Sequence, residues 1–508
     1  MRAVFATVAM LSVGTSGSLA QTPAPGPLGP CQKIGIACES AGFVLGGAAE
    51  GRGLWQDCVT PIMAGQTRPA SARPLPIIDP QLKAACLAAQ PNIGEPRVEP
   101  PAPTTPTLTY TASAPTVFMR QQELWGYGFQ WGPSDGPFGA IPLGEDRYRF
   151  FGAAGGGRRC PPTAWKEGVF SFTGTLDRVT GGDGCRILIG AGDGPSGWLF
   201  NANYSGGGQL IRFAAHGQSG WLMTFRGEYH WKNPASPNGL CEGGGAAFAG
   251  GVPCYYSTLG LAVSTDGGKT FKVAGESLQL TDPLSASKGG SVNRNIGYGS
   301  LIVADANGKH LDNPPPDPKT AYIYLMFVSS GKDLPGRCTI AQCPGLARAH
   351  YEDVVSAVLS GHPHAVARLF RKYDTTSPDP WGQPATGDAP DLSMGGGTFS
   401  PLFPANGFHM VIYDRAFDVY LGAVIVYVAP GPGLSLRTSP DLIHWSEPIG
   451  PPIRDGQRAL SYVTLLGETG DPTVSGGEPR LYFRSTEEGK ATFRDSVFKV
   501  VRLKLSRK

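Results

Sequence analysis

The stretch STDGGKTF at residues 264–271 carries the strongest structural signal in the chain. It follows an apolar and aromatic run at residues 255–262, and its pattern is S-x-D-x-G-x-T-F. In such a segment the Asp carboxylate accepts backbone N–H groups, a Gly supplies a positive φ, and the aromatic residue packs beneath the turn. The stretch therefore predicts a tight hairpin turn between two strands.

The same arrangement, an acidic turn leading into an aromatic residue, recurs along the chain. SPDLIHWS at residues 439–446 is a second copy, and residues 485–493 are a degraded third copy. Turns of this kind, known as Asp-boxes, recur in β-propellers, in which each blade is a four-stranded sheet. Because they are structural devices, we expect Asp266 and Asp441 to hold turns and not to act in catalysis.

The composition favours short strands joined by many turns. The 508 residues include 72 Gly and 47 Pro, and 16% of the chain is charged. This much Gly and Pro disfavours a helical bundle, while 41% hydrophobic and 10% aromatic residues exclude disorder over the whole length. We expect strands at residues 148–151, 186–189, 221–225, 321–328, 421–428, 480–484 and 497–505, and helices at 351–360 and 364–372.

The chain divides into four parts by composition. Residues 1–20 have the single positive charge, short apolar core and small final residues of a signal peptide, so we expect a secreted or periplasmic protein. Residues 21–92 form a small Cys-rich module, residues 93–115 a Pro-rich linker, and residues 116–508 an all-β domain. Within the module, Asp79 is expected to cap a helix that starts at Pro80 and is pinned through Cys86.

The ten cysteines all follow residue 20, and an even number in an exported chain predicts disulfides. Three local pairs close loops rich in Gly or Pro: Cys160 with Cys185, Cys241 with Cys254, and Cys338 with Cys343. The pairing among Cys31, Cys38, Cys58 and Cys86 stays open.

Several classes of protein are disfavoured. The net charge of +3 implies neither nucleic acid nor an anionic membrane as partner, and no apolar run is long enough to span a membrane. No phosphate cradle, G-x-S-x-G elbow or HExxH helix is present. We expect no cofactor and no metal site, apart from a structural Ca²⁺ that Asp388 and Asp391 could bind. The oligomeric state is left open.

Several segments resemble five-bladed β-propeller glycoside hydrolases of the arabinanase-like clan. Residues 439–446 resemble the S-x-D-L-x-x-W-S turn of these enzymes. Residues 134–144, followed by 147–151, resemble their first-blade signature. Residues 225–230, the run at 255–262 and the segments 321–328 and 345–349 resemble a secreted propeller family that has endo-D-arabinanases among its members. Ser134 departs from the Arg or Asn that normally precedes the acidic residue.

This resemblance implies a five-bladed propeller preceded by the small disulfide-rich module, and a glycoside hydrolase acting on a polysaccharide or oligosaccharide. The substrate that it points to is an arabinan-type furanose polymer. Two alternatives remain, a non-catalytic carbohydrate-binding propeller and a sialidase-like exo-glycosidase. The second fits less well, because only one well-formed Asp-box is present and the Arg-Ile-Pro motif of sialidases is absent.

Glycoside hydrolysis needs one carboxyl group to protonate the leaving oxygen and a second to attack or to activate water. Asp135, in a Gly- and Pro-bounded turn, is the candidate base or nucleophile, and Glu228, which ends an apolar strand, is the candidate acid. The alternatives are a plain turn for Asp135 and an ion pair with Arg226 for Glu228. Asp414 and Asp193 are possible third carboxylates, although each could instead be structural.

Aromatic residues around the two carboxyl groups are the candidate substrate-binding groups. Trp125 and Trp131 surround Asp135 in the sequence together with Phe138, and His230 and Trp231 follow Glu228. Aromatic faces stack on sugar rings, and apolar surroundings favour the protonated form of a carboxyl group. For His230, a structural role is the competing interpretation.

Overall fold

Contacts in the computed structural model divide the chain into two units, Met1–Arg97 and Val98–Lys508. The expected signal peptide at residues 1–20 lies outside the described part of the chain. The structure describes residues 30–43, 55–67, 69, 72–89, 106–120, 123, 129–131, 136–156, 167–182, 185–193, 200, 204–231, 254–278, 294–330, 342–361, 366–377, 379–386, 396–403, 408–428, 431–456, 460–486 and 496–508.

The first unit is helical in its described residues. The backbone N–H of Gln81 donates to Asp79 Oδ1 over 2.8 Å, which confirms the predicted cap, and Cys86 on the capped helix is fully buried. Cys38 and Cys58 form a disulfide, which answers part of the open pairing. Cys86, Cys185 and Cys343 are also disulfide-bonded. The elements are α1 (Pro30–Ser40), the π-helical turn η2 (Trp55–Val59), α2 (Thr60–Ala64) and α3 (Pro80–Ala89).

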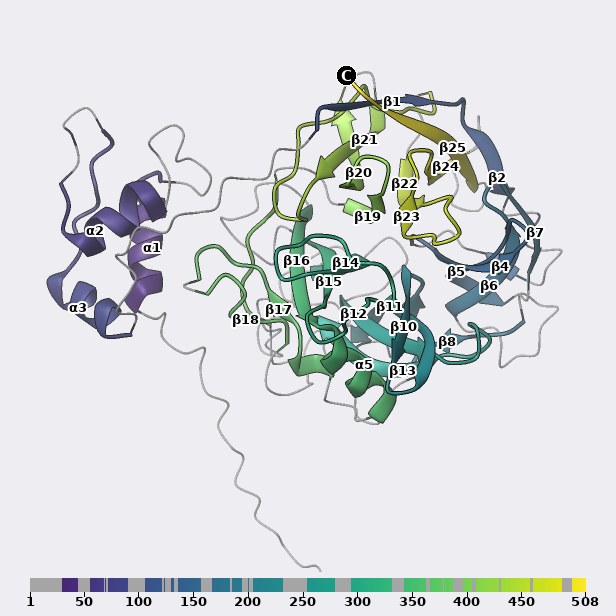
Figure 1. Ribbon diagram of the computed structural model, residues 1–508, viewed down its shortest axis with the longest axis horizontal. Helices are drawn as coiled ribbons and strands as arrows, with labels where there is room; N and C mark the ends of the chain where they lie inside the picture. Colours follow the sequence, from purple (N-terminus) through teal and green to yellow (C-terminus); the bar gives the residue numbers. More distant parts are fainter. Residues whose placement is uncertain are drawn as a thin grey trace, which may run out of the picture. The chain divides into compact units, whose positions relative to one another are not determined.

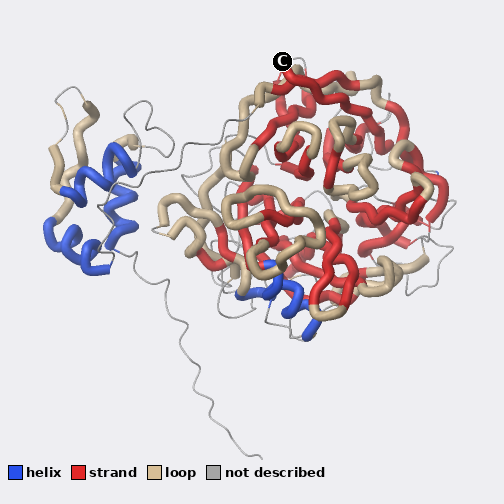
Figure 2. The backbone as a smooth tube through the Cα atoms, viewed as in Figure 1, coloured by secondary structure: helices blue, strands red, loops and turns tan. Residues whose placement is uncertain are grey.

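The second unit is a five-bladed β-propeller, as the sequence predicts (Figures 1 and 2). Blade 1 contains β3 (Phe129–Trp131), β4 (Gly139–Gly144), β5 (Arg147–Gly156), β6 (Glu167–Thr175), β7 (Arg178–Gly182) and β8 (Ile189–Gly190). Blade 2 contains β9 (Tyr204–Gly206), β10 (Leu210–Ala215), β11 (Gln218–Trp231), β12 (Cys254–Ser264) and β13 (Lys272–Leu278). Blade 3 contains β14 (Arg294–Ala304), β15 (Tyr322–Ser330), β16 (Gln342–His350), β17 (Arg371–Lys372) and β18 (Gln383–Pro384).

The remaining strands complete the ring. Blade 4 contains β19 (Phe408–Asp414), β20 (Val419–Val428) and β21 (Gly431–Ser439), with the short β23 (Val474–Ser475) pairing onto β19. Blade 5 contains β22 (Leu460–Leu466), β24 (Arg480–Thr486) and β25 (Ser496–Arg507), joined by β1 (Leu108–Ala112) and β2 (Thr116–Arg120). By the order of strands in the sheets, the innermost strands of the blades are β4, β9 with β10, β14, β19 and β22.

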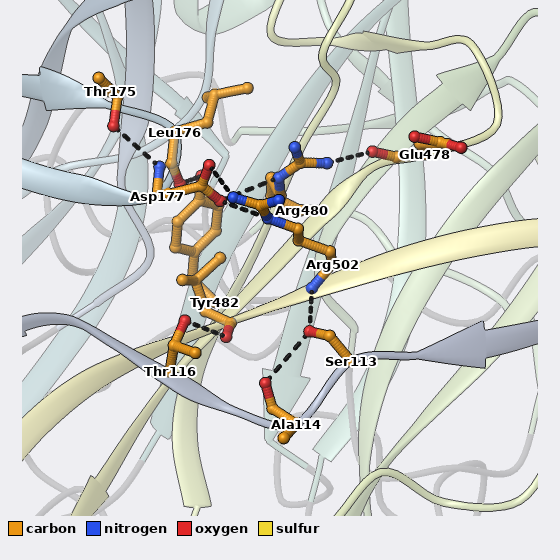
Figure 3. Close-up of polar contacts among 11 residues, drawn as sticks. Ser113, Ala114, Thr116, Thr175, Leu176, Asp177, Glu478, Arg480, Tyr482 and Arg502 are labelled. Atoms are coloured by element: carbon orange, nitrogen blue, oxygen red, sulfur yellow. Dashed lines mark hydrogen bonds and ion pairs between the residues drawn. The ribbon is translucent and has the colours of Figure 1, made fainter.

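The first and last strands close the ring, because β1 pairs antiparallel with β25, Leu108 lying opposite Arg507. The predicted C-terminal end of the linker, residue 115, is therefore wrong, since residues 108–112 already belong to blade 5. Figure 3 shows a second closure, in which Asp177 of blade 1 contacts both Arg480 and Arg502 of blade 5. Arg502 Nη2 donates to Asp177 Oδ2 over 2.7 Å, and Arg480 Nε donates to Asp177 Oδ1 over 3.2 Å.

A cluster of aromatic rings fills the interface between blades 1 and 5. Phe138 is fully buried and stacks on Phe118 at 5.7 Å between ring centroids, with Tyr482 edge-on at 5.1 Å. Such pairs add about 0.5–1.5 kcal/mol each beyond the burial of their area. Phe138, expected among the aromatic groups around Asp135, is therefore part of the core and has no face free for a sugar.

Most of the predicted strands and one of the predicted helices are present. In β25, buried Val501, Leu503 and Leu505 alternate with exposed Arg502 and Lys504, which is the pattern of a half-buried strand. The helix over 351–360 is α5 (Tyr351–Ser360). Of the helix predicted over 364–372, the described residues 366–372 contain the 3-10 turn η4 (Val366–Arg368) and β17 instead. Of the strand predicted at 186–189, only Ile189 lies in a strand, β8.

The two acidic turns are held by the hydrogen bonds expected of them. Asp266 Oδ1 accepts from the backbone N–H groups of Lys269 and Thr270, and its neighbours Gly267 and Gly268 have φ of 74° and 77°. Burial opposes ionisation of Asp266, but hydrogen bonds from Thr270 and its neighbours lower its pKa to about 2. Phe271 packs edge-on against Phe151 of blade 1.

The second turn, at residues 439–446, has the same chemistry. Asp441 Oδ1 accepts from the backbone N–H groups of Ile443 and His444. Burial would raise the pKa of Asp441, but hydrogen bonds from His444 lower it. Both carboxylates are therefore occupied within their own turns, in agreement with the structural role expected for them.

Candidate functional site

Glu228 lies on β11, the second strand of blade 2, where it pairs with Tyr204 of β9 and Ser257 of β12. Because side chains on a strand alternate between faces, Arg226 projects from the same face two residues earlier. Arg226 Nη2 lies 2.5 Å from Glu228 Oε1, and the two side chains are 13% and 14% exposed. The ion pair that the sequence left as the alternative for Glu228 is therefore present in the structure.

Arg226 also lines a narrow crevice where blades 1, 2 and 3 meet, which is too tight to admit a water molecule. The glycines there permit close approach of the backbones. A Cβ atom at Gly207 would lie 2.7 Å from the carbonyl oxygen of Phe151, and one at Gly208 would lie 2.2 Å from that of Thr224. Close packing thus explains the run at residues 206–208. The lining residues are Gly136, Pro137, Gly206, Gly207, Gly208, Thr224, Phe225, Arg226, Leu259 and Gly299.

Hydrogen bonds between innermost strands mark a common level in the central channel. Gln209 Nε2 donates to the carbonyl oxygen of Val411 over 3.0 Å, and the Val411 N–H donates to Ser300 Oγ over 2.9 Å. These residues belong to the innermost segments of blades 2, 4 and 3. They therefore provide a reference from which the candidate acids can be placed along the channel.

Glu228 and Asp414 lie toward opposite ends of this channel. Glu228 pairs with Tyr204, which precedes Gln209 by five positions, whereas Asp414 follows Val411 by three positions on β19. Innermost strands of a propeller run in the same direction. At about 3.3 Å per residue, the two acids are separated by roughly 25 Å along the strands. The structure therefore does not bring Asp414 together with Glu228.

Asp414 occupies a closed environment. Its side chain is fully buried, and Oδ1 accepts from the Phe417 N–H over 3.2 Å. Oδ2 has no hydrogen-bond partner among the described residues. Burial raises the pKa of Asp414, and the negative charge of Glu468 raises it further, although hydrogen bonds from Ser475 and Phe417 oppose the shift.

Asp193 belongs to a surface turn. Its Oδ2 accepts from the Gly190 N–H over 2.6 Å, and the Asp193 N–H donates to the Gly190 carbonyl oxygen over 3.1 Å. The side chain is exposed. These contacts are those of the turn that the sequence offered as the alternative role.

Other candidates fall outside what the structure describes. Asp135 and Trp125 lie outside the described residues, as do Asp388 and Asp391. The backbones of Trp131 on β3 and of His230 and Trp231 on β11 are described, but their side chains are not. The two residues that follow Asp135, Gly136 and Pro137, line the same crevice as Arg226.

From the sequence, Arg226 is only an alternative partner for Glu228. The structure makes Arg226 the link between Glu228 and the crevice. The signal was present in the R-x-E spacing, since two residues on one strand face the same side. No group of three or more His, Cys, Asp or Glu side chains in the described part is arranged to hold a metal ion. The described helices are all too short or too polar to cross a membrane.

The fold and site thus define a five-bladed propeller with an arginine-paired carboxylate at one end of its channel. An α-L-arabinofuranosidase from Podospora anserina, solved with cellotriose, is similar at 12% identity and a TM-score of 0.38, over 78% of this chain and 98% of that one. A GH62 α-L-arabinofuranosidase catalytic domain from Coprinopsis cinerea is similar at 10% identity and a TM-score of 0.37, over 79% and 98%.

A family 117 glycoside hydrolase from the marine bacterium Zobellia galactanivorans is similar at 9% identity and a TM-score of 0.39, over 79% and 91% of the two chains. No family model and no curated protein matches the sequence. Each of these TM-scores lies below 0.5, so the substrates of these proteins do not carry over to this chain.

Proposed function

We propose that the protein is a glycoside hydrolase that cleaves glycosidic bonds in a polysaccharide, with Asp135 and Glu228 as its two carboxyl groups. The observation that supports this proposal most directly is the placement of Glu228. Its carboxylate is held by Arg226 toward one end of the channel and remains 14% exposed. Gly136 and Pro137, which follow Asp135, line the crevice that Arg226 also lines.

The proposed reaction needs two carboxyl groups in different protonation states. One donates a proton to the glycosidic oxygen as the bond to the anomeric carbon breaks. The other, ionised, attacks that carbon or removes a proton from the attacking water. A neighbouring guanidinium favours the ionised form of a carboxyl group. The Arg226 contact therefore suits Glu228 to the role of base or nucleophile, with Asp135 as the acid, the reverse of the assignment based on sequence alone.

The substrate that we propose is an arabinan-type furanose polymer, and this choice rests on the sequence resemblance. Trp125, Trp131 and Trp231 would supply stacking faces for sugar rings, and His230 would bind a hydroxyl group. Export is part of the proposal, since the Cys38–Cys58 disulfide fits an oxidising compartment.

A carbohydrate-binding propeller without activity is the second candidate. The ion pair that supports a charged Glu228 is also what a purely structural sheet residue would have. Such a protein would bind the same glycans and release nothing. Measurements of release and of binding on one panel of glycans distinguish the two functions.

The test uses the exported chain, lacking residues 1–20, and a panel of arabinans and other plant and bacterial polysaccharides. We expect reducing sugar to be released, and Glu228→Gln and Asp135→Asn each to lower the rate by about 10²–10⁴-fold. Glu447→Gln and Asp312→Asn are matched controls, because these side chains are 92% and 77% exposed. Saturable binding without release, unchanged in all four variants, would favour the binding protein.

A further inference from the structure

A second pocket lies between blade 1 and the turn that joins β12 to β13 in blade 2. It encloses about 190 Å³, room for roughly six water molecules at about 30 Å³ each. Arg149 Nη1 makes a weak contact with the carbonyl oxygen of Gly267, 3.5 Å away, which joins the two blades at its edge. The lining residues are Arg149, Ser171, Thr173, Gly182, Arg186, Leu188, Gly268 and Lys269.

The described residues that line this pocket carry charge of one sign. Arg149, Arg186 and Lys269 line it, and no carboxylate is among the lining residues that the structure describes. None of these three cations forms an ion pair within the described part of the chain. The nearby Asp266 is committed to its own turn, where its oxygens accept from Thr270 and from other groups of that turn. The positive charge therefore stands without a neutralising group among the described residues.

Neutral donors complete the lining. Thr173 lies opposite Arg149 in the pairing of β6 with β5, and Ser171 faces the same side two residues earlier. Ser171 is only 8% exposed. Within the described part, neither hydroxyl group has a hydrogen-bond partner. Two arginines, a lysine and two residues with hydroxyl groups thus line one small volume.

We propose that this pocket binds an oxyanion: a phosphate, sulfate or carboxylate group, free or carried by a sugar. Arginine suits such groups, because its planar fork donates two parallel hydrogen bonds to paired oxygens. The volume accommodates a tetrahedral oxyanion together with part of its hydration or of its carrier.

The site is separate from the candidate active site, so the inference does not depend on the proposed function. Glu228 pairs with Ser257, whereas Lys269 lies beyond Ser264, at the far end of the same strand β12. Seven residues of strand between Ser257 and Ser264 correspond to about 23 Å. Because it contacts both blades, a bound anion would hold blade 1 to the blade 2 turn and stabilise the folded chain.

The test measures anion binding to the full exported chain at constant ionic strength, with chloride as the reference. We expect inorganic phosphate or sulfate to bind saturably in calorimetry and to raise the midpoint of thermal unfolding by about 2–5 °C at saturation. Arg149→Gln combined with Arg186→Gln should weaken binding at least about tenfold, since hydrogen bonds from charged donors are the strong ones.

The matched control is Arg147→Gln combined with Arg178→Gln. It removes the same charge from exposed positions of the same blade outside the pocket, and should leave binding unchanged. If the double variant in the pocket does not fold, Lys269→Gln, a single substitution at an exposed position, replaces it and should also weaken anion binding. No saturable binding of any anion, or equal losses in both double variants, would overturn the proposal.

Two further ligands identify the source of the anion. Glucuronate and glucose 1-phosphate are compared with glucose and with inorganic phosphate. Tighter binding of the charged sugars indicates an anion carried by a glycan, and equal affinity for inorganic phosphate indicates a free oxyanion; both results support the site. Binding of glucose as tight as that of glucuronate, unaffected by the arginine changes, would contradict it.

Discussion

The carboxylates at the two ends of the channel are held in opposite ways. Glu228 is 14% exposed and lies 2.5 Å from a guanidinium nitrogen of Arg226. Asp414 is fully buried, has an oxygen without a hydrogen-bond partner in the described part, and faces the negative charge of Glu468. The first arrangement keeps an ion-paired carboxylate partly exposed, whereas the second shields a carboxyl group from solvent and favours its neutral form.

The two acids look alike in the sequence, and this explains what sequence reasoning missed. Each ends an apolar strand, and each has an arginine within two positions, Arg226 or Arg415. Glu228, however, lies on the second strand of its blade and Asp414 on an innermost strand. Successive strands run in opposite directions, so their ends point to opposite faces. Arg415 pairs instead with Asp312 at 3.1 Å.

The largest effect expected from the comparison is that of Glu228→Gln on activity. The substitution keeps the shape and removes the charge, so the turnover of a responsive glycan should fall by about 10²–10⁴-fold. The free energy of unfolding, measured with urea, should change much less than the rate. A loss of activity that merely follows a loss of folded protein would remove Glu228 from the proposed site.

Arg226→Gln is expected to have the next largest effect. Loss of the guanidinium removes a charge-assisted hydrogen bond, so the rate should fall by about 10–100-fold. The acid limb of the pH–rate profile should move to higher pH, because the ionised form of Glu228 loses the positive charge of Arg226 beside it. Arg226→Lys keeps the charge and should keep that limb near its original position. An unshifted limb in Arg226→Gln would show that another group titrates there.

Asp414→Asn should leave activity within about twofold of the wild type and act on stability instead. Because the folded-state pKa of Asp414 is raised, the folded protein binds more protons than the unfolded chain above the usual pKa of 3.8. The wild type therefore loses stability as pH rises through this range, and the Asn variant lacks that loss.

Unfolding with urea at several pH values measures this difference. The Asn variant should be more stable than the wild type at pH 8, because it has no buried negative charge, and the gap should close toward pH 4. A loss of activity in Asp414→Asn comparable to that of Glu228→Gln would indicate that Asp414 takes part in the reaction, and would contradict the structural role assigned to it.

The sequence predicts features that depend on neighbouring residues, and it does not predict contacts between distant parts of the chain. The turn at residues 264–271 and the alternation in β25 predicted strands and turns correctly, because both depend on neighbours along the chain. The closing strand β1 was assigned to the linker because its partner, β25, lies at the other end of the chain. The burial of Phe138 and the separation of Asp414 from Glu228 likewise depend on contacts between blades, which local pattern does not contain.

Glu468→Gln should have the smallest effect and refine the account of the buried end. Glu468 Oε1 accepts from the N–H groups of Gly476 and Glu478, at 2.7 and 3.2 Å, and a glutamine oxygen can still accept both. Removing the charge lowers the raised pKa of Asp414, so the stability lost with rising pH should be smaller than in the wild type. In the double variant with Asp414→Asn, Glu468→Gln should change the free energy of unfolding little further, because the repulsion between the two carboxylates is already absent. Fully additive effects at pH 8 would mean that the two carboxyl groups do not interact, and burial alone would then explain the state of Asp414.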